Sequence, residues 1–389
     1  MAIVTPLYKN KGSPTDMNNY RGISVLTPIG KMFEKIVATQ ITTHFNINNL
    51  FFDGQHGFRT DHSCETALHE LLSIINDAKN KKLIALLLFI DFRKAFDLVD
   101  SNLLINKLFH YGFSNEALNL IKNYFSNRSQ SVKVDNELSE SILQLLGTVQ
   151  GSTLGPLFFI IFINDLPFIL TEFIVKMFAD DTTLIKTHTD VDRLISSFKN
   201  SLQMLTEWCE TNRLDINWSK TYFMFITNRR VDLPSSITFN GITIEVVKEF
   251  KLLGVTLDSK LNFKTYCSLV KKSVIRKLYS IKRLFYLCDS VKLQFFKTFV
   301  APHFDYCSSL YIYFPKVSIQ KLFSCYNYCL YKLLRINTSE SDQNIFNSNL
   351  ENKFNLNSFI HRNIIKNTTF IHKIINNNHS PSDLKSKLK

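Results

Sequence analysis

The order of apolar and polar positions along the chain predicts alternating helices and strands. Residues 31–45 carry apolar side chains at helical spacing and predict a helix. Residues 83–92 are too short and too uniformly apolar for a surface helix, so they predict a central strand buried on both faces. The charge of Asp91 interrupts this strand abruptly. Alternation of this kind up to residue 259 indicates a mixed α/β or α+β body.

Local signals place the other elements of this body. Ser101 is expected to cap a helix that runs through His110 and stops at Gly112. Apolar residues recur every three or four positions over residues 193–209, which predicts an amphipathic helix. The remaining signals predict a hairpin over 173–186 that turns at Ala179-Asp180-Asp181, a strand pair at 222–227 and 237–247, and a turn at 253–255.

The charge of the chain is unevenly distributed. Residues 260–389 hold 21 Lys and Arg against 6 Asp and Glu, whereas the residues before them hold 25 against 27. A basic excess confined to one region is typical of a surface that meets a polyanion, either nucleic acid or an anionic membrane, and it also occurs on a solvated face. Residues 264–288 predict a helix with one apolar face and an opposite face rich in Lys and Arg.

Three carboxylates are candidates for metal chemistry. Asp180 and Asp181 alone are a weak signal, because Asp is an ordinary turn residue. If Asp91 ends a strand of the same sheet, all three carboxylates can converge, and their repulsion favours a neutralising cation. Hard oxygen ligands select Mg²⁺ or Mn²⁺, and two such ions roughly 3.5–4 Å apart serve in-line phosphoryl transfer.

A glycine-rich loop at residues 147–156 precedes an apolar segment at 157–163. Glycine lets a polymer approach the backbone closely, and Gln150 can bond a base or sugar edge without adding charge. The loop lacks the Lys of a P-loop, which argues against nucleotide binding in the manner of the NTPases. A purely structural turn explains the loop alone equally well.

Taken in order, seven motifs resemble the reverse transcriptase of non-LTR (LINE-type, jockey-like) retrotransposons. They are YRGIS (20–24), QHGFR (55–59), FIDFRKAFD (89–97), VQGSTLGP (149–156), FADD (178–181), NRLDINWSKT (212–221) and LGVTLD (253–258). The resemblance implies an α+β fold of right-hand polymerase architecture. Fingers and palm with an antiparallel sheet are expected over residues 1–258, a mainly helical basic thumb and C-terminal region over 259–370, and a polar tail that frays over 371–389.

The resemblance also implies the activity and its site. The chain is expected to be an RNA-directed DNA polymerase that copies an RNA template from a DNA primer with dNTPs. Asp91, Asp180 and Asp181 match the catalytic carboxylates and, with the Phe92 carbonyl, the ligands of two Mg²⁺ (or Mn²⁺) ions.

Further positions match the family's nucleotide and duplex contacts. Arg21 matches the residue that grips the triphosphate, with Lys9 or Lys11 assisting. Phe96 matches the gate against the ribose 2′-hydroxyl, Gln150 lines the incoming nucleotide and Lys220 lies near the leaving pyrophosphate. The basic helix contacts the template and primer backbone through Lys271, Lys272, Arg276, Lys282 and Arg283.

Two departures keep an alternative open. Gly22 and Val149 stand where the family usually has Pro, and the chain is expected to lack an upstream endonuclease and part of the fingers. The alternative is a truncated, catalytically weak or inactive retroelement remnant that only binds nucleic acid. A group II intron maturase is disfavoured by Gly155-Pro156, and a two-metal nuclease by Phe96 and Gln150.

Other sequence features bear on the compartment. The apolar runs 83–90 and 157–163 are far shorter than the roughly 18–20 residues that span a bilayer, and the amino terminus lacks the order of a signal peptide. Seven cysteines without a CxxC pair are expected to be buried free thiols. An intracellular protein of the nucleus and/or cytoplasm is expected.

Overall fold

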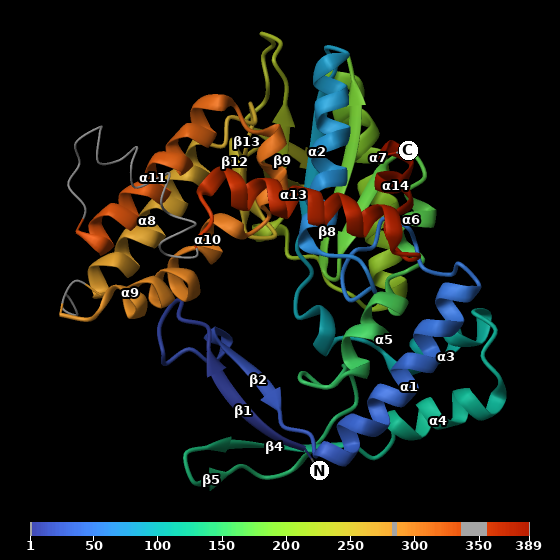
Figure 1. The fold of residues 1–389 in the computed structure, drawn as a ribbon. Coiled ribbons are helices and arrows are strands. Elements are labelled where there is room, and N and C mark those ends of the chain that lie inside the picture. The colour runs from blue at the N-terminus through green and yellow to red at the C-terminus, as the bar shows by residue number, and fades with distance from the viewer. Residues whose placement is uncertain (1, 282–285, 336–355, 389) are drawn as a thin grey trace. The chain divides into compact units, whose positions relative to one another are not determined.

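The computed structural model describes residues 2–281, 286–335 and 356–388 (Figure 1). The chain forms two compact units, each assembled from separated stretches of sequence. The first comprises residues 1–59, 87–223 and 234–245, and the second comprises 60–86, 224–233 and 246–389. The domain boundaries near residues 258 and 370 stay a prediction.

The first unit contains a small sheet built around β1 (Ala2–Tyr8). Strand β1 pairs antiparallel with β2 (Tyr20–Ser24) but parallel with β4 (Ser129–Val134). The short strands β5 (Glu137–Leu138) and β6 (Ile142–Leu143) pair with β4. The pairings β1–β2, β4–β5 and β4–β6 are antiparallel, and the pairing of β1 with β4, which lie far apart in sequence, is parallel.

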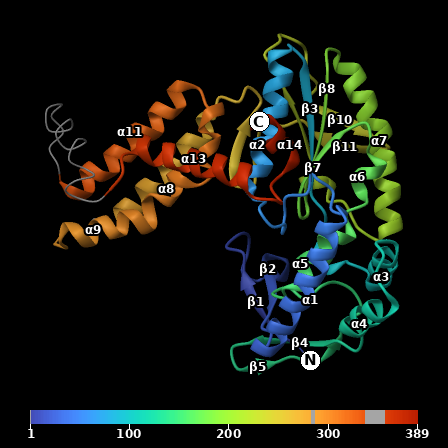
Figure 2. The ribbon, with the colours of Figure 1, turned by 45° about the vertical axis from the view of Figure 1, so that its right-hand side comes forward.

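The main sheet has the strand order β7-β8-β3-β9, and Figure 2 labels its strands β3, β7 and β8. Its strands are β7 (Ile174–Phe178), β8 (Asp181–His188), β3 (Ile84–Ile90) and β9 (Tyr222–Ile226). All seven residues of β3 are buried, which confirms the predicted central strand. The predicted hairpin is confirmed as well, since β7 and β8 pair antiparallel with Phe178 opposite Asp181.

The predicted strand over residues 237–247 is wrong. Residues Asn240 and Gly241 form a turn between β10 (Ser236–Phe239) and β11 (Ile242–Glu245), and both turn residues have positive φ. Asn-Gly is the strongest short hairpin signal, because both residues tolerate the left-handed conformation that such a turn needs. The expected pairing with β9 is wrong too, because β10 pairs with β11.

Helices of the first unit follow the predicted positions closely. The helix expected over residues 31–45 is confirmed as α1, and the amphipathic helix over 193–209 as α7. The helix after Asp91 is capped by Asp100 instead of Ser101, because the Asp100 carboxylate accepts from the backbone N–H groups of Asn102 and Leu103. The helices are α1 (Pro28–Ile47), α3 (Ser101–His110), α4 (Asn115–Phe125), α5 (Leu154–Phe162), α6 (Leu166–Ile169) and α7 (Val191–Asn212), with 3₁₀ turns η1 (Met17–Asn19), η2 (Ala95–Asp97) and η3 (Trp218–Lys220).

The second unit is mainly helical. It has one hairpin, β12 (Glu249–Leu252) with β13 (Val255–Asp258), whose turn at Leu253 and Gly254 confirms the predicted turn. Its helical elements are α2 (Cys64–Asn80), α8 (Lys264–Ile281), α9 (Asp289–Phe295), the π-helical η5 (Phe296–Val300), α10 (Pro302–Asp305), η6 (Ser308–Tyr313), α11 (Lys316–Leu334), α13 (Phe359–Asn376) and α14 (Ser382–Leu388).

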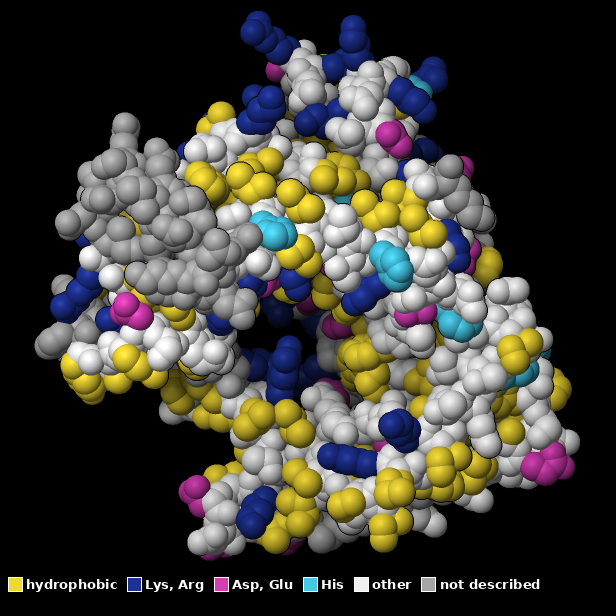
Figure 3. Space-filling model, viewed as in Figure 1, with side chains coloured by type: hydrophobic (Ala, Val, Ile, Leu, Met, Phe, Trp, Pro, Cys, Tyr) yellow, Lys and Arg dark blue, Asp and Glu magenta, His cyan; other side chains and the backbone are white. Residues whose placement is uncertain are grey.

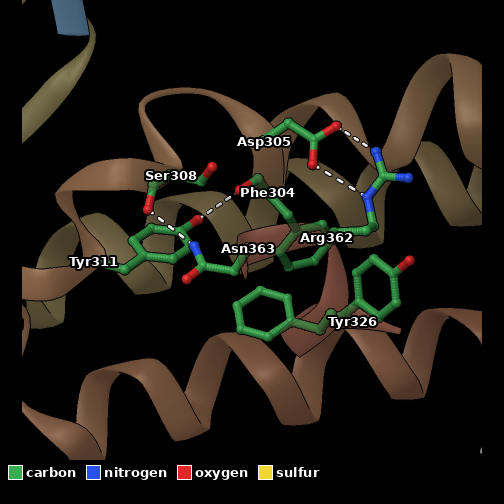
Figure 4. Close-up of a pocket in the computed structure, with 8 residues that line it drawn as sticks. Phe304, Asp305, Ser308, Tyr311, Tyr326, Arg362 and Asn363 are labelled. Atoms are coloured by element: carbon green, nitrogen blue, oxygen red, sulfur yellow. Dashed lines mark hydrogen bonds and ion pairs between the residues drawn. The ribbon is translucent and has the colours of Figure 1, made fainter. Parts of the chain in front are cut away.

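A closed aromatic cluster holds α10, α11 and α13 together. The ring of Phe304 meets those of Tyr326 and Phe359 edge-on, the rings of Tyr326 and Phe359 are tilted to each other, and the cavity among them measures only about 10 Å³. Asp305 and Arg362 form a two-contact ion pair at its edge (Figure 4). Burial by itself would lower the pKa of the Arg362 guanidinium, but the bonds and charge of Asp305 raise it.

Residues 371–376 and 382–388 are helical, so the expectation of a frayed tail is wrong for these two stretches. Helix α14 buries Leu384 and packs on α2, and Lys387 bonds the Ser73 hydroxyl at 2.5 Å. The outer surface of α13 is apolar in places (Figure 3). Its exposed hydrophobic residues are Ile360, Ile364, Ile365, Ile371 and Ile375.

Two further expectations concern cysteines and membranes. All seven cysteines are free, but Cys288 is exposed and Cys64 is half-buried, so the prediction of uniformly buried thiols is wrong for these two. Within the described residues, none of the helices combines the length and the hydropathy that a membrane span requires.

Candidate active site

Asp91 follows the last residue of β3 and is held by two residues that flank η3, Asn217 and Thr221. The Asn217 side-chain amide donates to Asp91 Oδ2 at 2.8 Å, and the Asn217 backbone N–H donates to the Asp91 carbonyl at 2.7 Å. The backbone N–H of Asp91 contacts the Thr221 hydroxyl at 3.4 Å. The Asp91 carboxylate thus lies at the end of a buried strand, where Asn217 bonds the carboxylate and Thr221 bonds the backbone.

Asp180 and Asp181 lie at the tip of the β7–β8 hairpin. Ala179 adopts a left-handed conformation with φ of 53°, which reverses the chain directly before the two acids. Such a conformation costs an L-residue free energy, so the surrounding contacts must stabilise it. The hairpin therefore presents both carboxylates at the end of the strand pair, as the sequence predicted.

The three carboxylates influence one another electrostatically. Burial and the charge of Asp91 raise the pKa of Asp180, while a backbone hydrogen bond and the charge of Arg21 act in the opposite direction. Burial, followed by the charges of Asp180 and Asp91, raises the pKa of Asp181 to about 6, although this residue remains exposed at the hairpin tip. The site is therefore a cluster of like charges whose ionised form is disfavoured without a cation.

The donor chemistry of this cluster fits a hard divalent cation. Carboxylate oxygens that repel one another are the ligands that Mg²⁺ and Mn²⁺ prefer. Phe92 forms an antiparallel bridge with Ile216, and the bonds flanking it use the backbone of Asp91 and Arg93. In this arrangement the Phe92 carbonyl points away from the neighbouring segment. Among residues 2–281, 286–335 and 356–388, however, no three acidic, His or Cys side chains converge on one metal position, so the expected convergence of the three carboxylates is not seen.

A cleft of about 980 Å³ opens beside Asp91 and Asp180. Arg21 on β2 is exposed and lines this cleft, and Lys220 of η3 lies on its wall as well. Lys9 also lines it, with its ammonium group bonded to the Asn18 carbonyl at 2.8 Å. The cleft therefore combines carboxylates with cationic side chains, an arrangement that suits a polyphosphate with bound metal.

Phe96 lies on the same wall, within η2. Its ring stacks on Phe159 of α5 at a centroid distance of 4.4 Å and meets Phe58 edge-on at 6.4 Å. The carbonyl of Phe96 accepts from the Thr148 backbone N–H at 2.8 Å. Phe96 is thus a rigid, half-buried aromatic wall of the cleft.

The glycine-rich loop packs tightly against the two segments around it. Gly147 has φ of 86°, and a Cβ there would lie 2.7 Å from the Asp97 carbonyl oxygen. Gly151 has φ of 108°, and a Cβ there would lie 2.6 Å from the Ser24 carbonyl oxygen. Gln150 enters the cleft wall, where its side-chain amide donates to Asp97 at 2.8 Å. Only glycine permits the backbone of the loop to come this close to Asp97 and Ser24, because it has no Cβ.

The two departures from the family pattern lie beside this wall. Val149 is buried, whereas Gly22 lines the cleft opposite Pro6 in the β1–β2 ladder. A Cβ at residue 22 would approach the Val4 side chain to 2.7 Å. Both positions therefore belong to the wall of the cleft, and neither is one of the three candidate carboxylates.

The predicted basic face lies on α8 of the second unit. Lys271, Lys272 and Arg276 are exposed, whereas Val270 and Val274 are buried on the opposite side of the helix. The predicted contacts Lys282 and Arg283 lie outside the described residues. The helix thus has the two faces that its sequence pattern predicted.

A family model described as "Reverse transcriptase (RNA-dependent DNA polymerase)" matches residues 8–257. The chain belongs to the reverse transcriptase family. The resemblance seen in the seven motifs is therefore confirmed, and with it the right-hand polymerase fold of the family.

Relatives within the reverse transcriptase family come from retrotransposons. The RNA-directed DNA polymerase from mobile element jockey of Drosophila funebris is 27% identical over 332 residues, which cover 82% of this chain and 36% of that protein. The probable RNA-directed DNA polymerase from transposon BS of Drosophila melanogaster is 26% identical over 292 residues, or 73% of this chain and 32% of that protein. The chain therefore spans about a third of the length of these relatives.

Among solved structures, apo telomerase from Candida tropicalis is 12% identical, with a TM-score of 0.46, over 95% of this chain and 67% of that one. This likeness is too low to support any inference about the chain.

Sequence reasoning missed several residues that shape this reverse transcriptase site. Asn217 and Thr221 hold Asp91, and Asp97 holds Gln150, but none of them was singled out. Each belongs to one of the motifs quoted above, so the motif order was the available signal. Their roles depend on contacts between residues more than 50 positions apart, which local patterns do not reveal.

Proposed function

We propose that this reverse transcriptase domain is an RNA-directed DNA polymerase that adds dNTPs to a primer 3′-hydroxyl opposite an RNA template. The observation that carries the proposal is a single cleft in which Asp91 and Asp180 meet the cationic residues Arg21 and Lys220. A polymerase has to bind triphosphate, metal and primer end in one place, and this cleft offers the chemistry for all three.

The acidic residues are proposed to hold the metal ions. Asp91, Asp180 and Asp181, with the carbonyl of Phe92, would bind two Mg²⁺ (or Mn²⁺) ions. When bound, these ions lower the pKa of the primer hydroxyl and stabilise the charge of the pyrophosphate leaving group. Burial, with added repulsion from neighbouring carboxylates, raises the pKa of Asp180 and Asp181. This supports the role, because a bound cation offsets both the burial of the ionised groups and their repulsion.

The cationic residues are proposed to bind the triphosphate. The planar guanidinium of Arg21 can donate two parallel bonds to phosphate oxygens, which fixes the orientation of the nucleotide. Lys220 is proposed to lie near the leaving pyrophosphate, with Lys9 as a further cation on the wall. Both roles follow from charge and from position in the cleft.

The choice of nucleotide is assigned to Phe96 and Gln150. The stacking of Phe96 on Phe159 restricts movement of the ring, so a ribose 2′-hydroxyl that approaches it meets a fixed obstacle. Gln150 is proposed to line the incoming nucleotide with its amide, whose position Asp97 fixes. A dNTP is thereby favoured over an rNTP.

The template and primer are proposed to contact the basic face of α8 through Lys271, Lys272 and Arg276. Contacts of this kind go to phosphates and carry no sequence information, so binding should weaken steeply with salt. Action on an RNA template and a DNA primer is also why we propose an intracellular site, the nucleus and/or the cytoplasm.

The experiment is incorporation of a single dNTP onto a DNA primer annealed to an RNA template, with Mg²⁺, by residues 1–389. The matched control is the double variant Asp180→Asn, Asp181→Asn, which keeps side-chain size and removes both charges. Extension by the wild-type protein and none by the control supports the proposal. Salt-sensitive template binding by both proteins without extension would instead indicate a remnant that only binds nucleic acid.

A further inference from the structure

The QHGF motif at residues 55–58 has no role in the function proposed above, yet it packs directly on the catalytic hairpin. The segment runs parallel to β7, with Gln55 paired to Met177. The His56 backbone N–H donates to the Met177 carbonyl at 2.8 Å, and the Met177 N–H donates to the Gly54 carbonyl at 2.8 Å. The motif thus forms a single parallel bridge to the edge strand β7.

The side chain of Gln55 extends this contact to the hairpin turn. Its Oε1 accepts from the backbone N–H of Ala179 at 3.0 Å and from that of Gly57 at 2.8 Å. The side chain is 1% exposed, so these bonds are shielded from water. Because both partners are donors, only the amide oxygen can face them, which fixes the orientation of the amide.

Ala179 is the residue that needs this support. It has φ of 53°, and Asp180 and Asp181 follow it directly. A left-handed alanine persists only where the surrounding contacts determine its conformation. The bond from its N–H to Gln55 is a contact of that kind.

Gly57 allows the side chain of Gln55 and the turn to come together. A Cβ at position 57 would lie 2.3 Å from the Ala179 nitrogen, which no side chain tolerates. Residue 57 is therefore restricted to glycine by the hairpin itself, and the motif and the turn form one tightly packed unit.

The amide of Gln55 is costly in this position. In the described part of the chain its Nε2 is buried without a hydrogen-bond partner. Buried polar atoms are normally paired, and an unpaired one destabilises the fold. An apolar residue of the same size would avoid this cost, so the acceptor oxygen is the feature of Gln55 that the fold uses.

We propose that Gln55 is a positioning residue that holds the Ala179 turn and thereby orients the carboxylates of Asp180 and Asp181. The expected effect on catalysis rests on the polymerase function proposed above. The contact between Gln55 and the Ala179 turn does not depend on that function. Gln55 touches no substrate in this account and acts through the backbone of the hairpin.

The test compares Gln55→Met with Asn164→Leu. The first variant keeps the length of the side chain and removes the acceptor. Asn164 is about as buried as Gln55 and bonds the segment that precedes Gln55 in the chain. Its side chain accepts from the Phe52 N–H at 2.9 Å and donates to the Leu50 carbonyl at 2.8 Å, whereas the Ala179 N–H donates to Gln55. Both variants therefore lose buried hydrogen bonds, but only one loses the bond to the turn.

Three measurements are made on both variants of the full chain. Amide hydrogen exchange of a peptide covering residues 174–186 reports on the turn, Mn²⁺ affinity reports on the carboxylates, and single-dNTP incorporation gives kcat and the Mg²⁺ concentration for half-maximal rate. Binding of the primed template serves as the reference.

We expect faster exchange, weaker Mn²⁺ binding and a raised Mg²⁺ requirement in Gln55→Met alone, with kcat lowered roughly 10²-fold, the scale for a misplaced catalytic group, and template affinity unchanged. Equal exchange and equal Mn²⁺ affinity in the two variants would overturn the proposal. If the wild-type protein incorporates no dNTP while exchange and Mn²⁺ affinity still separate the variants, the polymerase proposal fails and the role of Gln55 stands.

Discussion

Two clusters of charged side chains in this molecule differ in how their charges are satisfied. In the first unit, Asp91 and Asp180 line a cleft of about 980 Å³, and Asp181 follows Asp180 directly in the chain. Burial together with neighbouring carboxylate charge raises the pKa of Asp180 and of Asp181. In the second unit, Asp305 meets the guanidinium of Arg362 through two contacts beside a cavity of about 10 Å³. One cluster is repulsive and open, and the other is paired and closed.

The difference separates groups kept for chemistry from groups kept for the fold. Both oxygens of Asp305 already bond the Arg362 guanidinium, and removal of one partner would leave the other charge partly buried and unpaired. Carboxylates that repel one another destabilise the protein and are retained where a ligand supplies the missing positive charge. The comparison therefore predicts opposite effects of the same substitution, Asp→Asn, in the two places.

The largest expected effect is on activity in the open cluster. Asp180→Asn should lower single-nucleotide incorporation by roughly 10³-fold or more, because a charged metal ligand is lost. The same variant should unfold at a denaturant concentration equal to or higher than that of the wild type at pH 7, since repulsion is relieved. Incorporation rates and urea unfolding measure the two effects, and a variant that is both active and unstable would break the comparison.

The next effect is on stability in the closed cluster. Asp305→Asn should lower the free energy of unfolding by about 2–4 kcal/mol, because Arg362 is left partly buried without its partner. Incorporation per folded molecule should stay near the wild-type rate. Arg362→Met tests the pair from the other side, and unchanged stability in both variants would show that the ion pair has no structural role.

The pH dependence should differ between the clusters as well. The native pKa of Asp181 is raised to about 6 from an ordinary value of 3.8, so the native state binds more protons than the unfolded state between these values. Without metal, the free energy of unfolding should therefore fall as the pH rises from about 4 to about 6. Urea unfolding at several pH values measures this slope, which Asp181→Asn should reduce.

Metal should act on the same transition. Mg²⁺ competes with the proton for the carboxylates and binds the native state. Added Mg²⁺ should therefore make the free energy of unfolding fall less as the pH rises from about 4 to about 6. A pH profile of unfolding that is identical with and without Mg²⁺ would argue against metal binding at this site.

The smallest effect concerns the basic face of α8. Lys271→Ala and Lys272→Ala should each weaken template binding modestly and lower the slope of log affinity against log salt by about 1. Lys199→Ala on α7, which is also exposed, is the control. Equal slopes in all three variants would remove α8 from the template contact.

Sequence patterns predicted the parts of the site that depend on local order. Strand β3 could be predicted from its uniform apolar run, and the β7–β8 hairpin from its Asp180-Asp181 turn. In both cases the pattern that predicts the element lies within about ten residues of sequence. The glycines of the 147–151 loop were readable for the same reason. In contrast, the Asn240-Gly241 turn was overlooked, although its signal is local.

Contacts between distant segments could not be predicted from such patterns. The parallel pairing of β1 with β4, the bond from Asn217 to Asp91, and the contact of Gln55 with Ala179 join residues separated by more than 120 positions. Each depends on where whole elements pack, and the residue types alone fit many partners. The candidate acids Asp91, Asp180 and Asp181 were therefore predictable, whereas the residues that contact them were not.

The central claim is that the open acidic cluster performs the chemistry and the closed ion pair supports the fold. One experiment tests it directly: single-dNTP incorporation on an RNA-templated DNA primer with Mg²⁺, measured beside urea unfolding for Asp180→Asn and Asp305→Asn. The account predicts that Asp180→Asn loses incorporation and keeps its stability, while Asp305→Asn loses stability and keeps its rate per folded molecule. The account would be contradicted if Asp180→Asn still incorporated dNTP at the wild-type rate. It would also be contradicted if Asp305→Asn remained folded but lost incorporation.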